Sequence, residues 1–333
     1  MTTKETDTQT VATRSRRSIA GIRTYGTIIG MVLVVAALGV ARPTFLGPQN
    51  LLAVGVDATV LIVVSVGLSL VMSMRGIDLS IAATADIAGY LAATMLLSGS
   101  GTLAAVFAAL AVGLFVGLVN GLLAGYFGVP AIVATLGVNL LLTTAALVIS
   151  SNGTPQQLFT APSELVSGFL TLGTGSVGPV RVLLIVAVLV VFSTWFASRR
   201  TVWGRQIDLV EASARAAFLA GIPVRAVFAA GFVASGLLAA LAGLMLVART
   251  GVALPGMSQA LLLEAFTAVY LGSIASPSGR VSVIWTVIGV IFVSLLANGL
   301  TLLGLGAPWL YGLNGALILI ALALGALRRE EKH

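Results

Sequence analysis

Long apolar runs separated by short polar segments dominate the chain. A helix needs about 20 apolar residues to cross about 30 Å of hydrocarbon. Runs of roughly that length lie near residues 22–41, 51–73, 79–97, 103–126, 130–149, 181–197, 225–247, 258–274, 283–303 and 308–327. The pattern predicts an all-α polytopic membrane protein with about ten transmembrane helices, of which the third and eighth are the least regular.

The two chain ends depart from this pattern. Residues 1–20 are polar and rich in Thr, Ser and Arg, so we expect a disordered cytoplasmic tail there. A second cytoplasmic tail is expected at 328–333, which leaves residues 21–327 as one transmembrane domain. A secretory signal is the alternative for the first apolar run. That run, at 25–41, is longer than a typical signal core, which favours a retained helix.

Basic residues indicate the orientation of the spans. With the N-terminus inside, all but Arg42, Arg181 and Arg249 of the 18 Lys and Arg residues face the cytoplasm. This bias follows the positive-inside rule and predicts that both termini are cytoplasmic. It also explains the net charge of +7 better than nucleic-acid binding does, because no soluble basic domain is present.

Composition excludes several classes of protein. The chain is 58% hydrophobic and 9% charged, which is far outside the range of soluble globular proteins. It has no cysteine and a single histidine, His333, so a thiolate or histidine metal site is not expected. No Gly-rich phosphate loop of the P-loop type occurs. We therefore expect no ATPase site, no other catalytic residue and no cofactor in this chain, and the energy for any transport must come from an ion gradient or another subunit.

The apolar runs form two similar halves. Spans two to five and spans seven to ten are four-helix groups of comparable length that start from opposite sides of the membrane, as in an inverted repeat. The third helix of each group contains an Asn-Gly-Leu motif, which begins at Asn120 in the first group and at Asn298 in the second. Such internal symmetry is typical of transporters, whose pathway forms where the repeats meet.

The segment Arg75-Gly-Ile-Asp-Leu-Ser80 precedes the weak third span. Asp78 or Ser80 is well placed to cap the next helix by accepting its free backbone N–H groups. The alternative is a role in a transport pathway through a broken or re-entrant helix.

Carboxylates within the spans are further candidates, since an ionised acid at the bilayer centre costs about 2.5 to 3.5 kcal/mol. Asp57, Asp86 and Glu264 qualify. Asp86 and Glu264 occupy corresponding helices of the two halves, but Asp57 and Glu264 lie near helix ends, where capping or snorkelling is ordinary. The candidate pathway residues are Asp78, Ser80, Asp86, Asn120, Asn298 and Glu264.

Charge is concentrated in one segment, residues 198–224. It is alanine-rich, and Gly221 and Pro223 close it, which predicts one or two short helices outside the hydrocarbon. We interpret it as a cytoplasmic surface for a partner protein. The longest external loop, at 150–180, carries an apolar patch that is read equally well as a half-helix or as an ordered loop.

Taken together, these sequence motifs resemble a known family, the permease subunits of bacterial ABC importers of the ribose, xylose and related monosaccharide group. That group is related to the branched-chain amino acid permeases. The resemblance runs from about Phe45 to Leu327. It rests on Gly76 to Ser80; Asn120 to Leu122; Thr135 to Gly137; Gly204 with Arg205; Ala216 to Ile222; Ser235 to Gly243; and Asn298 to Leu300.

The resemblance implies a fold of about ten helices in a bacterial plasma (inner) membrane. It implies a homo- or heterodimer of permeases, two cytoplasmic ABC ATPases that bind ATP and Mg, and an extracytoplasmic sugar-binding protein. It also implies that residues 198–224 are the coupling segment that docks on the ATPase. The coupling residues are then Gly204, Arg205, Glu211, Arg215, Ala216, Ala217, Leu219 and Gly221.

Two departures bear on the substrate and the partner. Glu211 to Arg215 replaces a Gly-Gly-Asn-Glu-Glu stretch common in the family, and Asp86 stands where an apolar residue is commoner. We expect a monosaccharide importer, for a pentose or similar sugar. A permease for an amino acid or signalling molecule and an ion-coupled secondary transporter remain alternatives, the latter depending on Asp86.

Overall fold

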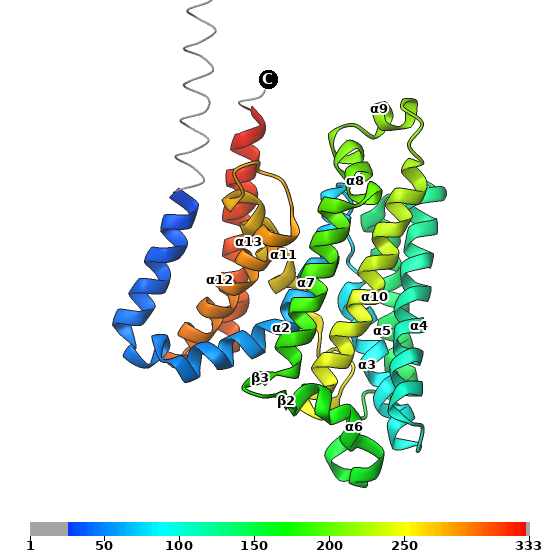
Figure 1. Ribbon diagram of the computed structural model, residues 1–333, viewed down its shortest axis with the longest axis vertical. Helices are drawn as coiled ribbons and strands as arrows, with labels where there is room; N and C mark the ends of the chain where they lie inside the picture. The colour runs from blue at the N-terminus through cyan, green and yellow to red at the C-terminus, as the bar shows by residue number, and fades with distance from the viewer. Residues whose placement is uncertain (1–25, 331–333) are drawn as a thin grey trace, which may run out of the picture.

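The computed structural model describes residues 26–330, and helices make up most of it (Figure 1). The predicted tail at 1–20 and residues 331–333 lie outside this range, whereas residues 328–330 continue the last helix. The apolar helices are Gly26–Ala41, α2 (Pro48–Ser73), α3 (Ile81–Leu97), α4 (Thr102–Gly121), α5 (Ala131–Ile149), α7 (Val182–Arg200), α10 (Val224–Thr250), α11 (Gln259–Ala275), α12 (Val283–Leu302) and α13 (Ala307–Glu330).

Each predicted apolar run therefore forms a helix whose bounds agree within a few residues, and the prediction of an all-α polytopic membrane protein is confirmed. Among residues 26–330, six helices are long and apolar enough to cross a membrane, namely α2, α4 with its extension, α5, α7, α10 and α12. The two apolar runs predicted to be least regular, the third and the eighth, form α3 and α11, which have 17 residues each. How many helices cross remains a prediction.

Short elements join the apolar helices. A 3-10 turn, η1 (Pro43–Leu46), precedes α2, and the π-helical turn η2 (Leu122–Tyr126) extends α4. The others are η3 (Leu158–Thr160), α6 (Ser163–Thr174), α8 (Val202–Ala212), α9 (Ala214–Leu219) and the two-residue strands β1 (Gln156–Gln157), β2 (Ser176–Val177), β3 (Val180–Arg181) and β4 (Val252–Ala253). β1 pairs antiparallel with β4, and β2 with β3.

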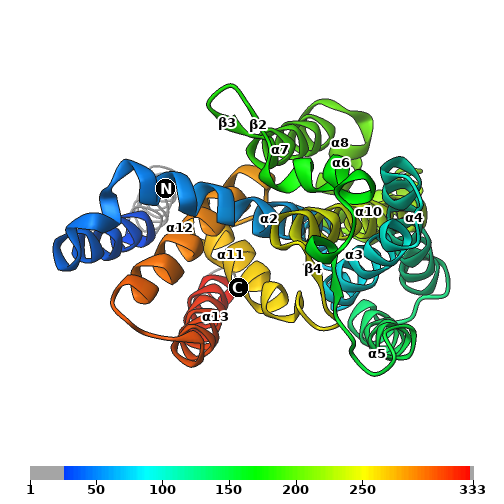
Figure 2. The same ribbon diagram turned by 90° about the horizontal axis from the view of Figure 1, so that it is seen from below.

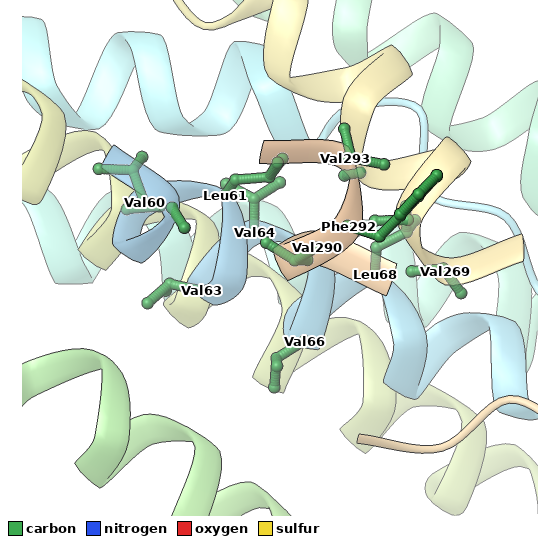
Figure 3. Close-up of a cluster of buried hydrophobic side chains, with 14 of the residues drawn as sticks. Val60, Leu61, Val63, Val64, Val66, Leu68, Val269, Val290, Phe292 and Val293 are labelled. Carbon is green, nitrogen blue, oxygen red and sulfur yellow. The ribbon is translucent and has the colours of Figure 1, made fainter. Parts of the chain in front are cut away.

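The long helices α2 and α10 lie at the centre (Figure 2). α10 packs on α3 and α4, while α2 packs on α11 and α12, and the two central helices also contact each other. Figure 3 shows the contact of α2 with α12, where Leu61 and Val64 of α2 lie near Val290 and Val293 of α12. Each central helix is therefore buried by helices from the other half of the chain.

A row of glycines lets α4 approach α10 closely. Gly113, Gly117, Gly121 and Gly125 recur every four residues and so share one helix face. A Cβ added at Gly117 would meet the backbone oxygen of Phe232 at 2.6 Å. Only small residues permit this backbone contact, which is the usual means of close packing in lipid.

The two ends of the bundle differ. α8 and α9 lie at one end, which is also where α13 finishes, and α6 with β2 and β3 lies at the opposite end (Figure 1). The apolar patch in the long predicted loop forms a helix, α6, and the charged segment forms two short helices, as expected.

We predict that Gly117→Leu lowers the stability of the detergent-solubilised protein by about 1 to 3 kcal/mol or more, because its side chain would be forced into the α10 backbone. The matched control is Gly137→Leu in α5, where an added Cβ meets nothing within 4 Å. Thermal unfolding of both variants checks this. Equal melting temperatures for the two would contradict the packing described here.

Candidate functional site

An irregular segment between α2 and α3 enters the helix bundle. After α2 ends, residues 76–79 belong to no helix, yet Asp78 and the adjoining N-cap residue Ser80 are 2% and 1% exposed. Gly76 allows this entry, because a Cβ there would meet Val71 Cγ1 at 2.8 Å and Phe228 Cζ at 3.0 Å. The polar backbone groups of this segment therefore need partners inside the protein.

The carboxylate of Asp78 is one such partner. Its Oδ1 accepts hydrogen bonds from the backbone N–H of Ser80 (3.0 Å) and from Ser80 Oγ (2.7 Å). Its Oδ2 accepts a hydrogen bond from Ser235 Oγ of α10 at 2.8 Å. Ser80 occupies the N-cap position of α3, but its hydroxyl bonds Asp78 and makes no cap hydrogen bond. Asp78 thus ties the start of α3 to α10.

Two more helices complete this arrangement. Asn120 of α4 donates from Nδ2 to Ser80 Oγ at 2.8 Å. The backbone N–H of Leu79 donates to Thr135 Oγ1 of α5 at 3.1 Å. We call Asp78, Ser80, Asn120, Thr135 and Ser235 the α3 polar cluster. The Oδ1 atom of Asn120 is buried there and accepts no hydrogen bond from residues 26–330.

Asp86 likewise holds a non-helical backbone segment, in this case the turn before α11 in the second half of the chain. It lies in α3, and its carboxylate accepts hydrogen bonds from the backbone N–H groups of Ser258 (2.8 Å) and Gly256 (3.1 Å). These two residues form the turn that precedes α11. Asp86 also lines a cavity of about 130 Å³ between α3, α5 and this turn, together with Thr143 and Pro255. It therefore both holds the start of α11 and faces open space.

The remaining candidates do not join the α3 polar cluster. Asn298 of α12 exchanges hydrogen bonds with Asn50 of α2, at 2.8 and 3.1 Å, so it has a different partner from Asn120. Glu264 is half-buried in α11. Asp57 forms an ion pair with Arg249 at 2.8 Å, which links α2 to α10.

The charged segment folds on a small core of its own. Ile207 and Val210 of α8 and Ala217 of α9 pack against Met74 at the end of α2 and Val227 of α10. Gly204 is buried against the backbone of Ser198 at the junction of α7 and α8, where a Cβ would not fit. Gly221 closes the segment with a φ of +80°, a conformation that favours glycine.

The coupling candidates thus divide by position. Gly204 and Ala217 are buried and shape the segment, whereas the exposed candidates are Arg205, Arg215, Ala216, Leu219 and Gly221. Phe218, not among the candidates, is 69% exposed beside Leu219 at 78%. α9 therefore presents an unusual apolar surface to its surroundings.

Glu211 points back toward the rest of the protein. Its carboxylate lies 3.8 Å from Arg280 of the α11–α12 loop. Burial raises the pKa of Glu211, and Asp208 adds to this, while Arg280 and Arg75 act against it.

Within residues 26–330, no group of three or more His, Cys, Asp or Glu side chains could hold a metal ion. The site instead consists of hydrogen-bonded polar groups at the starts of two helices, which position the non-helical backbone there.

The helices and the buried α3 polar cluster define the class of this protein: it is an all-α, multi-pass membrane protein with polar contacts between its spans. Residues 50–322 match the family described as branched-chain amino acid transport system / permease component, and the chain belongs to that family.

Several curated relatives cover almost the whole chain. The ribose import permease protein RbsC of Escherichia coli K12 is 31% identical, over 94% of this chain and 97% of its own. The D-allose transport system permease protein AlsC of the same strain is 30% identical, over 91% of each chain. The probable ABC transporter permease protein y4mJ of Sinorhizobium fredii is 30% identical, over 96% of this chain and 95% of its own. No solved structure matches.

Sequence reasoning did not identify Ser235 and Thr135 as site residues, although both are fully buried members of the α3 polar cluster. Each is a polar residue within an apolar helix, and that signal could have found them. The backbone of Gly256 and Ser258 gave no such signal, because their role depends on a contact with a distant helix.

We predict that Ser235→Ala destabilises the protein by about 1 to 3 kcal/mol, because it removes a hydrogen bond to the buried Asp78 carboxylate. The control is Ser69→Ala, since the buried Ser69 hydroxyl bonds only the Val66 carbonyl of its own helix, at 2.7 Å. Unfolding in detergent measures both, and a loss no larger at Ser235 than at Ser69 would count against the cluster.

For Asp86 we predict a graded effect. Asp86→Ala leaves two backbone N–H groups without an acceptor, at a cost of about 1 to 3 kcal/mol for each. Asp86→Asn keeps one acceptor oxygen and should fall between the alanine variant and the wild type. The melting temperatures of the three proteins test this order. An alanine variant as stable as the wild type would refute the assigned role of Asp86.

Proposed function

We propose that this chain is the membrane-spanning subunit of an ATP-binding cassette importer that passes a monosaccharide, a pentose or similar sugar, into the cytoplasm. The observation that carries this proposal is the near full-length similarity to permeases named for ribose and allose import, a pentose and a hexose. The near full length of these alignments matters because such a length takes in the apolar helices, the α3 polar cluster and the charged segment.

The partner proteins are part of the proposal. A second permease, identical or not, completes the membrane portion; two cytoplasmic ATPases bind ATP and Mg; and an extracytoplasmic sugar-binding protein delivers the solute. The exposed apolar surface of Phe218 and Leu219 on α9 supports docking of an ATPase at the α8–α9 end.

An inverted repeat of ten spans with both termini cytoplasmic, in a bacterial plasma membrane, is also proposed. The repeat is supported by the lengths of the corresponding helices, which nearly agree. α2 and α10 have 26 and 27 residues, α3 and α11 have 17 each, and α4 and α12 have 20 each. Ser80 and Ser258, which start α3 and α11, also have nearly equal backbone angles. The end of the bundle that holds α8 and α9 is rich in arginine, which favours the cytoplasm.

Movement of the ATPases would reach the spans through direct contacts. The α8–α9 core packs on Met74 and Val227, which lie at the ends of α2 and α10. Four residues beyond Met74, Asp78 bonds α10 again through Ser235. A shift of α8 and α9 would therefore be passed to the start of α3.

The candidate pathway residues take different roles in this proposal. Asp78, Ser80 and Asn120 hold the start of α3, since they bond one another or α10. Asp86 lines a cavity and Glu264 is half-buried, and we assign these two to the solute pathway, whereas Asn298 bonds Asn50 and joins α12 to α2. Alternating access would then open and close the space beside α3 and α11.

The test of the proposed function is sugar uptake in cells that lack their own importers. With the cognate binding protein and ATPase present, uptake of a radiolabelled monosaccharide from a pentose and hexose panel is expected, and it should stop when the ATPase is deleted. Uptake that continues without the ATPase would contradict the proposal.

We also predict that Leu219→Asp abolishes ATP-driven uptake, because it places a charge in the apolar surface of α9. Leu219→Met keeps that surface apolar and should retain uptake. Membrane insertion of both variants is checked by membrane fractionation and blotting. Full uptake by an inserted Leu219→Asp protein would show that α9 does not dock on the ATPase.

A further inference from the structure

An open groove of about 370 Å³ lies at the α8–α9 end of the bundle. The ends of four helices border it: Met74 and Arg75 follow α2, Gly125 belongs to the extension of α4, Val210 to α8, and Arg225 to the first turn of α10. In the orientation proposed above, these helix ends, and the groove with them, would lie at the depth of the lipid headgroups.

The groove carries two exposed arginines. Arg75 and Arg225 both line it, and neither guanidinium lies within ion-pair distance of an acid among residues 26–330. Glu211, which also borders the groove, is half-buried, has Arg280 at 3.8 Å and lies near enough to Arg75 for that charge to lower its pKa, so it offsets only part of the charge of the two arginines. The groove thus presents an excess of positive charge with hydrogen-bond donors, which suits a phosphate.

An apolar stripe on α4 leads to the same place. Leu114, Leu118, Leu122 and Tyr126 are all exposed, and their spacing of four residues places them along one face of the helix. Each follows one of the glycines that pack on α10, so the stripe runs beside the α4–α10 contact and ends next to Gly125 in the groove. A stripe of this kind fits an acyl chain.

We propose that this groove binds the headgroup phosphate of an anionic phospholipid, held by Arg75 and Arg225, with the acyl chains along the α4 stripe. The occupant is a lipid of the leaflet that adjoins α8, which is the cytoplasmic leaflet in the orientation proposed above. The binding itself does not depend on the transported solute or on the ATPase.

Native mass spectrometry of the purified full-length protein in detergent tests this proposal. Titration with phosphatidylglycerol should give binding about tenfold tighter than with phosphatidylcholine, because two arginines meet one net negative charge. The double variant Arg75→Gln/Arg225→Gln should lose most of this preference, and Arg75→Lys/Arg225→Lys should retain much of it. Melting temperatures without added lipid establish that the variants are folded, and the single variant Arg225→Gln serves if the double variant is not.

The matched control is Arg199→Gln/Arg200→Gln, which removes the same charge from two exposed arginines at the end of α7. It should keep the preference for phosphatidylglycerol. An unchanged preference in the groove variant, or an equal loss in the control, would overturn the proposal. So would full competition by free glycerol phosphate at the same concentration, because the groove would then be a site for soluble phosphate. Normal lipid preference with loss of ATPase binding in the groove variant would assign the arginines to the partner protein instead.

Discussion

Backbone that is neither helix nor strand can lie among membrane spans only if its polar groups find partners inside the protein. Two segments of this chain face that constraint, one before α3 and one before α11. In each of them, a carboxylate from the first half of the chain accepts hydrogen bonds from backbone N–H groups. Asp78 bonds the backbone N–H of Ser80 in its own segment, and Asp86 bonds the N–H groups of Gly256 and Ser258 across the bundle.

This requirement links parts of the protein that are far apart in the sequence. Asp78 reaches Ser235, and Asn120 and Thr135 bring α4 and α5 to the same point. Because α10 also packs on the α8–α9 core, the exposed segment and the start of α3 belong to one connected set of contacts. The two segments are held differently, since Asp78 belongs to the segment that it bonds, whereas the start of α11 is held by Asp86 of α3.

The positions of the helices were predictable because membrane thickness fixes the length of an apolar run. The short helices of the charged segment were predictable from their glycine and proline boundaries. The partners within the site were not. Asn120 and Asn298 lie in the same Asn-Gly-Leu motif, but Asn120 bonds Ser80 whereas Asn298 bonds Asn50. Nothing in the sequence near Asp86 indicates its contact with Gly256. Such contacts depend on how helices that are far apart in the sequence cross one another. The crossing leaves no periodic pattern of apolar residues from which it could be predicted.

The most direct test is hydrogen–deuterium exchange at the backbone amides of Leu79 and Ser80 in the folded protein. Both amides are bonded to side chains, Thr135 and Asp78, within a non-helical segment. We expect them to exchange as slowly as amides inside α3. Exchange at the rate of an unstructured peptide would mean that residues 76–80 are not held in the bundle, and would contradict the account.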